Sequence, residues 1–322
     1  SGSGFSGTTS SSSALKGGSI ASQQSASGFL NGGFYGPGAD EVGAVWSIYD
    51  GTNAAIGVFG APRAAPPTTI GAFSAASMGS TPPTTAANGF QQATDPKVVF
   101  PGPVGTVFAL TQSAIKITPV NGATGATVTA DTATNAQGGT LIMTNTNGHR
   151  ADGARLVIPS LGIDVAISPM SFSPVNVQSA NGLWAGATFP FYENYSVLGR
   201  WNVAASATGA PSNVGYFTAG YQTPAGAVPT TGTATYNLST VVGEVYTPAQ
   251  NTSTFAPYTV ATLSGHGTLS ANFGTGAVTG ALTGMTVDTG TGVGYSWNDV
   301  SLSATLSGAT FSGTATTTSV PA

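Results

Sequence analysis

The sequence has no cysteine, only two histidines and few charged residues. Without cysteine, neither disulfides nor thiolate metal sites can form, so packing and hydrogen bonds must stabilise the fold. Neither His149 nor His266 has a second histidine or a paired carboxylate at the spacing of a metal site. Charged residues make up 6% of the chain, against roughly a quarter in typical soluble domains. The surface therefore depends on hydroxyl and amide groups, which is typical of secreted or surface-displayed β-proteins.

Basic patches and long apolar runs are also missing. The seven Lys and Arg residues are spread along the chain and the net charge is −4, which excludes the basic surface that nucleic-acid binding requires. No apolar run approaches the roughly 20 residues of a membrane helix, and no signal-peptide pattern begins at Ser1. We therefore expect an extracellular or surface-displayed protein, processed before residue 1, with no transmembrane segment and no nucleic-acid partner.

Short β-patterns fill most of the chain. Helical periodicity is nearly absent, because Gly, Thr, Val and Pro interrupt every candidate window within two turns. Alternating runs bounded by Gly, Pro, Asn or Asp occur throughout, for example at 43–49, 140–144 and 265–273. These runs predict an all-β fold whose C-terminal part has the strand spacing of a barrel or meander. Residues 61–96 differ, since two Pro-Pro pairs and little periodicity indicate a connector.

One long motif lies near the start of the chain. Residues 32–48 read GGFYGPGADEVGAVWSI, and residues 55–63 read AIGVFGAPR. Both phrases resemble the closing strands of the transferrin-binding protein B-like β-barrel, a module of bacterial surface lipoproteins and solute-binding proteins. The motif positions are occupied by Phe34, Tyr35, Gly36, Pro37, Ala39, Glu41 and Gly43, and the end of the last strand by Phe59, Gly60 and Ala61. The resemblance implies an antiparallel up-and-down barrel of about eight strands, and it gives Glu41 a role in closing that barrel through hydrogen bonds to backbone near Gly36 and Pro37.

The C-terminal part resembles the opening strands of the same barrel. The matching phrases are YSVLGRWNV (195–203), AVPTTGTATYN (227–237), GTLSANFGTGAVTGAL (267–282) and VSLSATLSGATFSGTATT (300–317). In the family, Phe-Ser-Gly-Thr precedes the closing strands; here it stands at 311–314 and again at 5–8. The resemblance therefore divides the chain into a donor segment carrying the closing strands (1–63), a Pro-rich connector (64–96), a β-rich handle-like subdomain (97–190) and an incomplete barrel (191–322).

Three arrangements can complete such a barrel. In a circular permutation, residues 29–63 fold back into their own barrel. In a fragment of a two-lobed surface protein, residues 1–63 are a remnant of another barrel. In donor-strand complementation, residues 29–63 of one subunit complete the barrel of the next, which produces a filament because a head-to-tail exchange does not close on itself. An open barrel with two unpaired edges invites such pairing.

From this reasoning we expect a structural protein: a subunit of an extracellular bacterial filament that polymerises head-to-tail with itself and serves in adhesion or biofilm. The predicted intersubunit donor residues are Phe34, Tyr35, Gly36, Pro37, Ala39, Glu41, Gly43, Val45, Trp46, Ile48, Ile56, Val58 and Phe59. The predicted acceptor residues of the barrel are Leu198, Trp201, Val203, Val300, Leu302, Leu306, Phe311 and Thr314.

The alternative is a monomeric surface protein of the same family with a permuted barrel, which binds a solute, haem or an iron carrier. Tyr35, Tyr216 and Tyr221 are the side chains that could ligate iron or haem in that case. No catalytic residue is expected, because there is no G-x-S-x-G motif and the adjacent Asp40 and Glu41 point to opposite faces of a strand. We predict neither enzyme activity nor a cofactor nor a metal.

Overall fold

The computed structural model describes residues 26–49, 53–64, 91–92, 105–119, 126–144, 153–167, 177–193, 195–207, 209–248, 258–288, 290 and 294–317. Most of these residues lie in strands, which confirms the predicted all-β fold. The first Phe-Ser-Gly-Thr phrase and most of the predicted connector lie outside the described residues.

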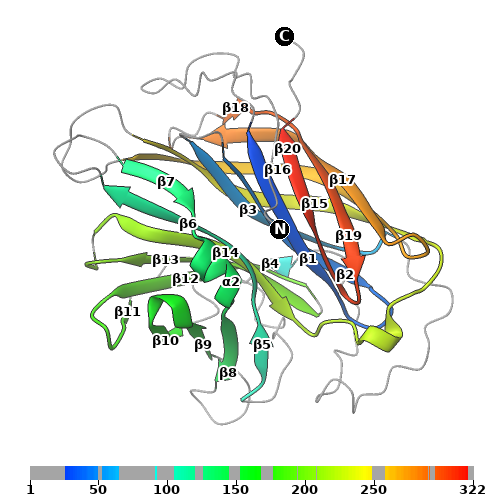
Figure 1. Cartoon of the computed structure of the whole chain (residues 1–322), viewed down its shortest axis with the longest axis horizontal. Coiled ribbons are helices and arrows are strands. Elements are labelled where there is room, and N and C mark those ends of the chain that lie inside the picture. Colours follow the sequence, from blue (N-terminus) through cyan, green and yellow to red (C-terminus); the bar gives the residue numbers. More distant parts are fainter. Residues whose placement is uncertain are drawn as a thin grey trace.

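Eight antiparallel strands close into a barrel (Figure 1). They are β1 (Ser27–Tyr35), β2 (Glu41–Tyr49), β3 (Ala54–Pro62), β15 (Thr233–Pro248), β16 (Tyr258–Asn272), β17 (Ala277–Asp288), β19 (Val300–Ser307) and β20 (Thr310–Thr317). Each barrel strand pairs with the next one along the chain, and β20 pairs with β1 to close the barrel. The short strand β18 (Gly294–Ser296) pairs with the end of β17. The predicted up-and-down barrel of about eight strands is thereby confirmed.

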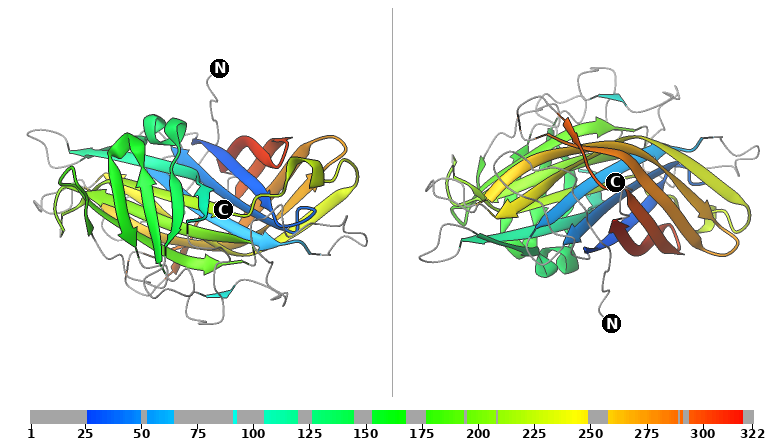
Figure 2. Two further views of the ribbon diagram at one scale, coloured as in Figure 1. Left: turned by 90° about the horizontal axis from the view of Figure 1, so that it is seen from below. Right: turned by 90° about the horizontal axis from the view of Figure 1, so that it is seen from above.

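The remaining strands are inserted between β3 and β15, and we call them the handle. Its larger sheet has the order β11-β12-β13-β14-β6-β7, with β4 beside β12, and its smaller sheet has the order β10-β9-β8-β5. The bounds are β4 (Gln91–Gln92), β5 (Val107–Ala109), β6 (Thr111–Pro119), β7 (Ala126–Ala130), β8 (Thr140–Thr144), β9 (Gly153–Ile158), β10 (Ile163–Ile167), β11 (Val177–Gln178), β12 (Trp184–Tyr192), β13 (Ser196–Ala204) and β14 (Pro211–Gly220). The helices are α2 (Thr132–Gln137), η1 (Pro159–Leu161) and η2 (Ala225–Ala227). Figure 2 shows most of the handle, in green, to one side of the blue, orange and red barrel strands.

The handle extends further along the chain than the sequence suggested. Residues 191–322 were expected to form the barrel, but β13 and β14 belong to the larger handle sheet, so this boundary is wrong. Both strands are almost entirely buried. A barrel strand with one face in solvent alternates apolar and polar residues, whereas a strand covered on both faces is apolar throughout. Such an apolar run does not show whether the strand belongs to the barrel or to the handle.

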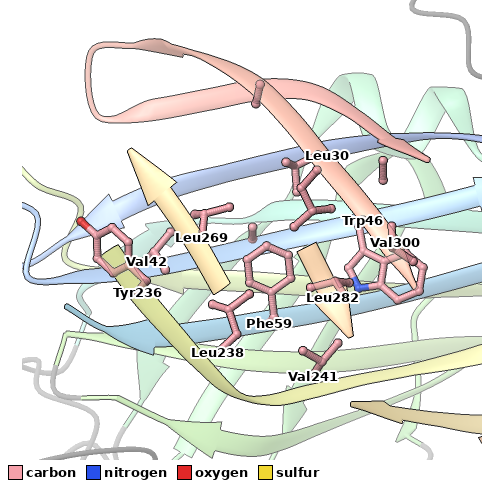
Figure 3. Close-up of a cluster of buried hydrophobic side chains, with 14 of the residues drawn as sticks. Leu30, Val42, Trp46, Phe59, Tyr236, Leu238, Val241, Leu269, Leu282 and Val300 are labelled. Atoms are coloured by element: carbon pink, nitrogen blue, oxygen red, sulfur yellow. The ribbon is translucent and has the colours of Figure 1, made fainter. Parts of the chain in front are cut away.

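Large side chains fill the interior of the barrel. Phe34 lies at the centre, with its ring centroid 5.6 Å from that of Tyr236, 5.5 Å from that of Phe273 and 5.4 Å from that of Phe311. Figure 3 shows Trp46, Phe59 and Tyr236 among Leu30, Leu238 and Leu282 inside the barrel. Aromatic packing of this kind fills a small barrel with its own side chains, which makes the barrel a scaffold.

A second apolar layer joins the barrel to the handle. The outward side chains of β2 and β3, which include Val45, Ile56 and Val58, pack against Ile115, Ile117, Val128, Leu198 and Val214 of the handle. A third layer fills the space between the two handle sheets and includes Trp201, Phe217 and Leu156. Strands β2 and β3 are therefore buried on both faces, which explains why their sequences are nearly continuous apolar runs.

Within the described residues, no helix has the length and apolar character needed to cross a membrane.

Candidate functional site

The N-terminal strands β1–β3 are paired along both flanks within their own chain. On one side β1 pairs with β20, with Phe29 opposite Thr314 and Gly32 opposite Phe311. On the other side β3 pairs with β15 from Ala54 to Gly60. The strands that the sequence predicts as donors thus complete the barrel that contains them in this structure.

The predicted donor residues divide between the two faces of these strands. Phe34, Trp46, Ile48 and Phe59 point into the barrel. Val45, Ile56 and Val58 point outward and pack against the handle. The remaining predicted donors, from Tyr35 to Gly43, lie in or beside the turn that joins β1 to β2. The donor segment therefore contacts the barrel and the handle at once.

The turn between β1 and β2 is held by the handle. Gly36 N donates to Tyr221 O at 2.9 Å, and Thr223 N donates to Phe34 O at 2.8 Å. The Thr223 hydroxyl donates to Gly36 O at 2.8 Å, and the ring of Tyr195 lies against Gly36. We call Glu193, Tyr195, Ser196, Tyr221 and Thr223 the hairpin-docking site. The motif FYGPGADE thereby acquires a structural role, because its turn is recognised by main-chain and side-chain groups of the handle.

Glu41 is the central side chain of this contact. It is 1% exposed, and its carboxylate accepts hydrogen bonds from Tyr195 N at 3.0 and 3.1 Å and from the Ser196 hydroxyl at 3.1 Å. The resemblance gave Glu41 hydrogen bonds to backbone near Gly36 and Pro37. Tyr195 and Ser196 belong to the handle, where the buried carboxylate satisfies a main-chain N–H and a hydroxyl that otherwise would lose their hydrogen bonds.

Two further carboxyl groups of this region, those of Glu193 and Asp40, each have an oxygen without a hydrogen-bond partner. Glu193 is 3% exposed, and its Oε1 has no hydrogen-bond partner. Burial, with the negative charge of Glu41 as a second cause, raises the pKa of Glu193 to about 9. Asp40 also has a buried oxygen, Oδ1, without a partner. Burial raises the pKa of Asp40 to about 6, although the nearby Arg63 opposes that increase.

A partly buried ion pair joins the barrel to the handle at a second point. Arg200 Nε on β13 donates to Glu244 Oε2 on β15 at 2.9 Å, and the Tyr246 hydroxyl donates to the same oxygen. Burial and the charge of Glu244 raise the pKa of Tyr216 beside this pair. Charged groups in such a position need matched partners, so this pair favours one alignment of the barrel on the handle.

The predicted acceptor residues fall into two groups. Val300, Leu302 and Phe311 point into the barrel, Leu306 packs against that core, and Thr314 lies on the strand beside β1. Leu198, Trp201 and Val203 are not barrel residues, so this part of the prediction is wrong. Leu198 contacts the barrel from outside, while Trp201 and Val203 face the core between the handle sheets. The spacing of these handle strands along the chain matches that of the barrel strands, so a single sequence does not distinguish handle strands from barrel strands.

Sequence reasoning missed the second flank and the docking residues. Strand β15, which pairs with β3, is absent from the predicted acceptors, as are Glu193, Tyr195, Thr223 and Glu244. One signal could have found the charged members. With only 11 acidic residues in the chain, a glutamate inside an apolar run such as VVGEVY marks a buried partner rather than a solvated surface.

Tyr35 and Tyr216, two of the three tyrosines that could ligate iron or haem, have their side chains buried among other residues. The Tyr35 hydroxyl accepts a hydrogen bond from Thr218 at 3.3 Å, and burial raises the pKa of Tyr35 to about 12. Tyr216 is buried beside Arg200 and Glu244. Across the described part of the chain, no three His, Cys, Asp or Glu side chains gather as a metal site would require. What this region can do chemically is bind a β-hairpin.

Comparison with known families supports the barrel. A family model described as the C-lobe and N-lobe β-barrels of transferrin-binding protein B matches residues 1–63. The match covers β1, β2 and β3, and the closed eight-stranded antiparallel barrel that these strands complete fits that description. In the comparisons with curated proteins and with solved structures, nothing matches the chain.

Proposed function

We propose that this chain, whose barrel is of the transferrin-binding protein B type, is a monomeric binding protein displayed at a bacterial cell surface. The observation that carries the proposal is the closure of the barrel by the chain's own β1–β3, with both flanks paired and the hairpin turn docked on the handle. Such a barrel needs no second subunit to satisfy the edges of its strands.

The binding surface lies outside the barrel interior. Phe34, Trp46 and Phe59 occupy that interior, so a ligand held there would have to displace packed aromatic rings. The barrel and the handle are joined by an apolar layer and a partly buried ion pair, which suits them to present exposed segments together to a partner. A macromolecular partner, with an iron-carrier protein as the first candidate, suits this arrangement better than haem.

The test combines assembly state with binding. Light scattering and negative-stain electron microscopy of the full chain should show discrete particles of one 31.6 kDa subunit. Immobilised chain should then retain iron-loaded transferrin and fail to shift the absorption spectrum of haem. Particles of one subunit that bind no iron carrier would leave the fold intact and remove the proposed partner.

The second candidate is the filament of strand-exchanged barrels. It is favoured by one observation: the groups that hold β1–β3, namely β15, β20 and the hairpin-docking site, are equally available in a second copy of the chain. An exchanged barrel would make the same contacts as a self-closed one. Filaments of the full chain that vanish when residues 1–63 are deleted would establish this function in place of the monomer.

A further inference from the structure

The contact between the hairpin and the handle contains two buried carboxyl groups, Glu41 and Glu193. Glu41, at the start of β2, has its oxygens engaged by Tyr195 N and the Ser196 hydroxyl. Glu193, at the end of β12, lies in the turn that its own N–H closes by donating to Ser196 O at 2.8 Å. The two side chains therefore approach from opposite partners of one interface, since one belongs to the hairpin and the other to the handle.

One carboxylate oxygen of Glu193 is buried without a hydrogen-bond partner. Glu193 is 3% exposed and its Oε1 has no partner among the described residues. A buried carboxylate in that condition, next to a second one, carries a large desolvation cost unless it is neutral. A metal ion is a poor solution here, because no third acidic or histidine side chain of the described chain joins the pair. A proton is the smallest species that removes the second charge.

We propose that the Glu41–Glu193 pair makes the docking of the N-terminal hairpin depend on a proton, which one carboxyl holds while the hairpin is docked and loses when the hairpin leaves the handle. The proposal concerns the fold of the single chain and does not rest on the proposed function.

The direction of the pH dependence follows from the two states. In the docked state Glu193 keeps its proton up to a pH of about 9. In the released state it is exposed and ionises near its ordinary pKa of 4.5. Between these limits release of the hairpin also releases a proton, so the opening constant rises by up to about tenfold for each pH unit.

The other ionisable groups described around the Glu41–Glu193 pair titrate mainly outside the range from pH 6.5 to 8.5. Asp40, in the turn, has a pKa raised to about 6, so its contribution ends near that pH. Arg63, directly after β3, opposes the rise in the pKa of Asp40. The pKa values of Tyr35 on β1, Tyr195 before β13 and Tyr236 on β15 are all raised by burial, so these groups titrate only in strongly alkaline solution. Among these groups, Glu193 is the one whose charge changes when the hairpin is released between pH 6.5 and 8.5.

The absence of cysteine makes a direct test possible. In the full chain, Ala44→Cys places one thiol inside the barrel on β2, where Ala44 is 0% exposed. Ala154→Cys places one in the core between the handle sheets, where Ala154 is 1% exposed. The rate of reaction with a disulfide reagent, divided by the rate of a free thiol at the same pH, gives the opening constant of each region.

We expect the corrected labelling of Ala44→Cys to rise about tenfold per pH unit between pH 6.5 and 8.5 and to exceed that of Ala154→Cys throughout. Adding Glu193→Gln, which keeps the shape and cannot ionise, should make the Ala44→Cys rate independent of pH. An unchanged slope in Glu193→Gln overturns the proposal, and so do equal rates at the two thiols, since the hairpin would then open only with the whole molecule.

A second variant tests the proposal even if Glu193→Gln does not fold. Glu41→Gln retains Glu193 and removes the charge beside it, so Glu193 should ionise at lower pH and the rise in labelling should end earlier in the titration. Circular dichroism confirms that each variant is folded. A rise that ends at the same pH as in the parent would show that the two carboxyls do not interact, which contradicts the proposal.

Discussion

The two halves of the barrel wall are built differently. Strands β2 and β3 are buried at nearly every position, whereas β17 and β19 alternate between buried and accessible residues. The reason is that the handle covers the outer face of the N-terminal strands, while β17 and β19 present serine and threonine outward. The N-terminal strands therefore belong to two cores at once, and the C-terminal strands belong to one.

This difference determines which strand segments of the barrel could be replaced by a segment from another copy of the chain. A segment that contributes to one core can be replaced by any strand of matching pattern, but β1–β3 must match the barrel, the apolar layer and the hairpin-docking site together. We infer that the segment is recognised with high specificity, whether it comes from its own chain or from another copy.

The largest expected effect comes from placing a charge on the doubly buried wall. Val45→Asp buries an unpaired carboxylate between β2 and the handle, and it should lower the free energy of unfolding by about 4 kcal/mol or more. Ser303→Asp makes a similar change at an outward position of β19, where it should alter stability by less than about 0.5 kcal/mol. Urea denaturation followed by tryptophan fluorescence measures both. Similar losses in the two variants would show that the outer faces do not differ.

The same difference explains what the sequence could predict. The alternation in β16–β20 and the long motif around Phe34 were enough to predict the barrel and its closing strands. The boundary between the handle and the barrel could not be predicted. Leu198, Trp201 and Val203 lie in a strand that is covered on both faces, and its apolar run resembles that of β2. The docking contacts depend on pairs such as Glu41 and Tyr195, which are 154 residues apart. A single sequence does not report such pairs, since the local pattern of each partner is satisfied by many alternatives.

The second prediction compares the two arginine–carboxylate pairs. The Arg200–Glu244 pair at the junction has side chains that are 20% and 13% exposed, whereas those of Arg155–Asp164 on the handle are 49% and 45% exposed. Glu244→Gln leaves the Arg200 charge buried and should cost about 3 kcal/mol. Asp164→Asn should cost far less, because solvent screens the exposed pair. Thermal unfolding at low and high salt checks this, and only the Arg155–Asp164 pair should weaken markedly with salt.

The third prediction compares two hairpin turns. Gly36, in the docked turn, has φ +75°, and an added Cβ would lie 2.5 Å from the Tyr195 ring. Gly308, between β19 and β20, has φ +59° with nothing within 4 Å of such a Cβ. Gly36→Ala should cost about 2 kcal/mol, and Gly308→Ala about 1 kcal/mol from the backbone alone. Equal losses by urea denaturation would mean that the Tyr195 ring moves aside and contributes little to docking.

The smallest effect concerns the partly exposed acid of the docked turn. Burial raises the folded-state pKa of Asp40 to about 6, so the stability that its protonated form provides is complete below the unfolded pKa near 3.8 and is lost as the pH rises through 6. Asp40→Asn should therefore stabilise the chain at pH 7 by about 1 kcal/mol, after allowance for solvent screening of this group, and should change nothing at pH 3.5. Urea denaturation at both pH values, carried out in the Glu193→Gln background, separates Asp40 from Glu193. A loss of stability at pH 7 would show that the ionised Asp40 is held favourably by Arg63, and that the docked turn accommodates this charge even though it does not accommodate that of Glu193.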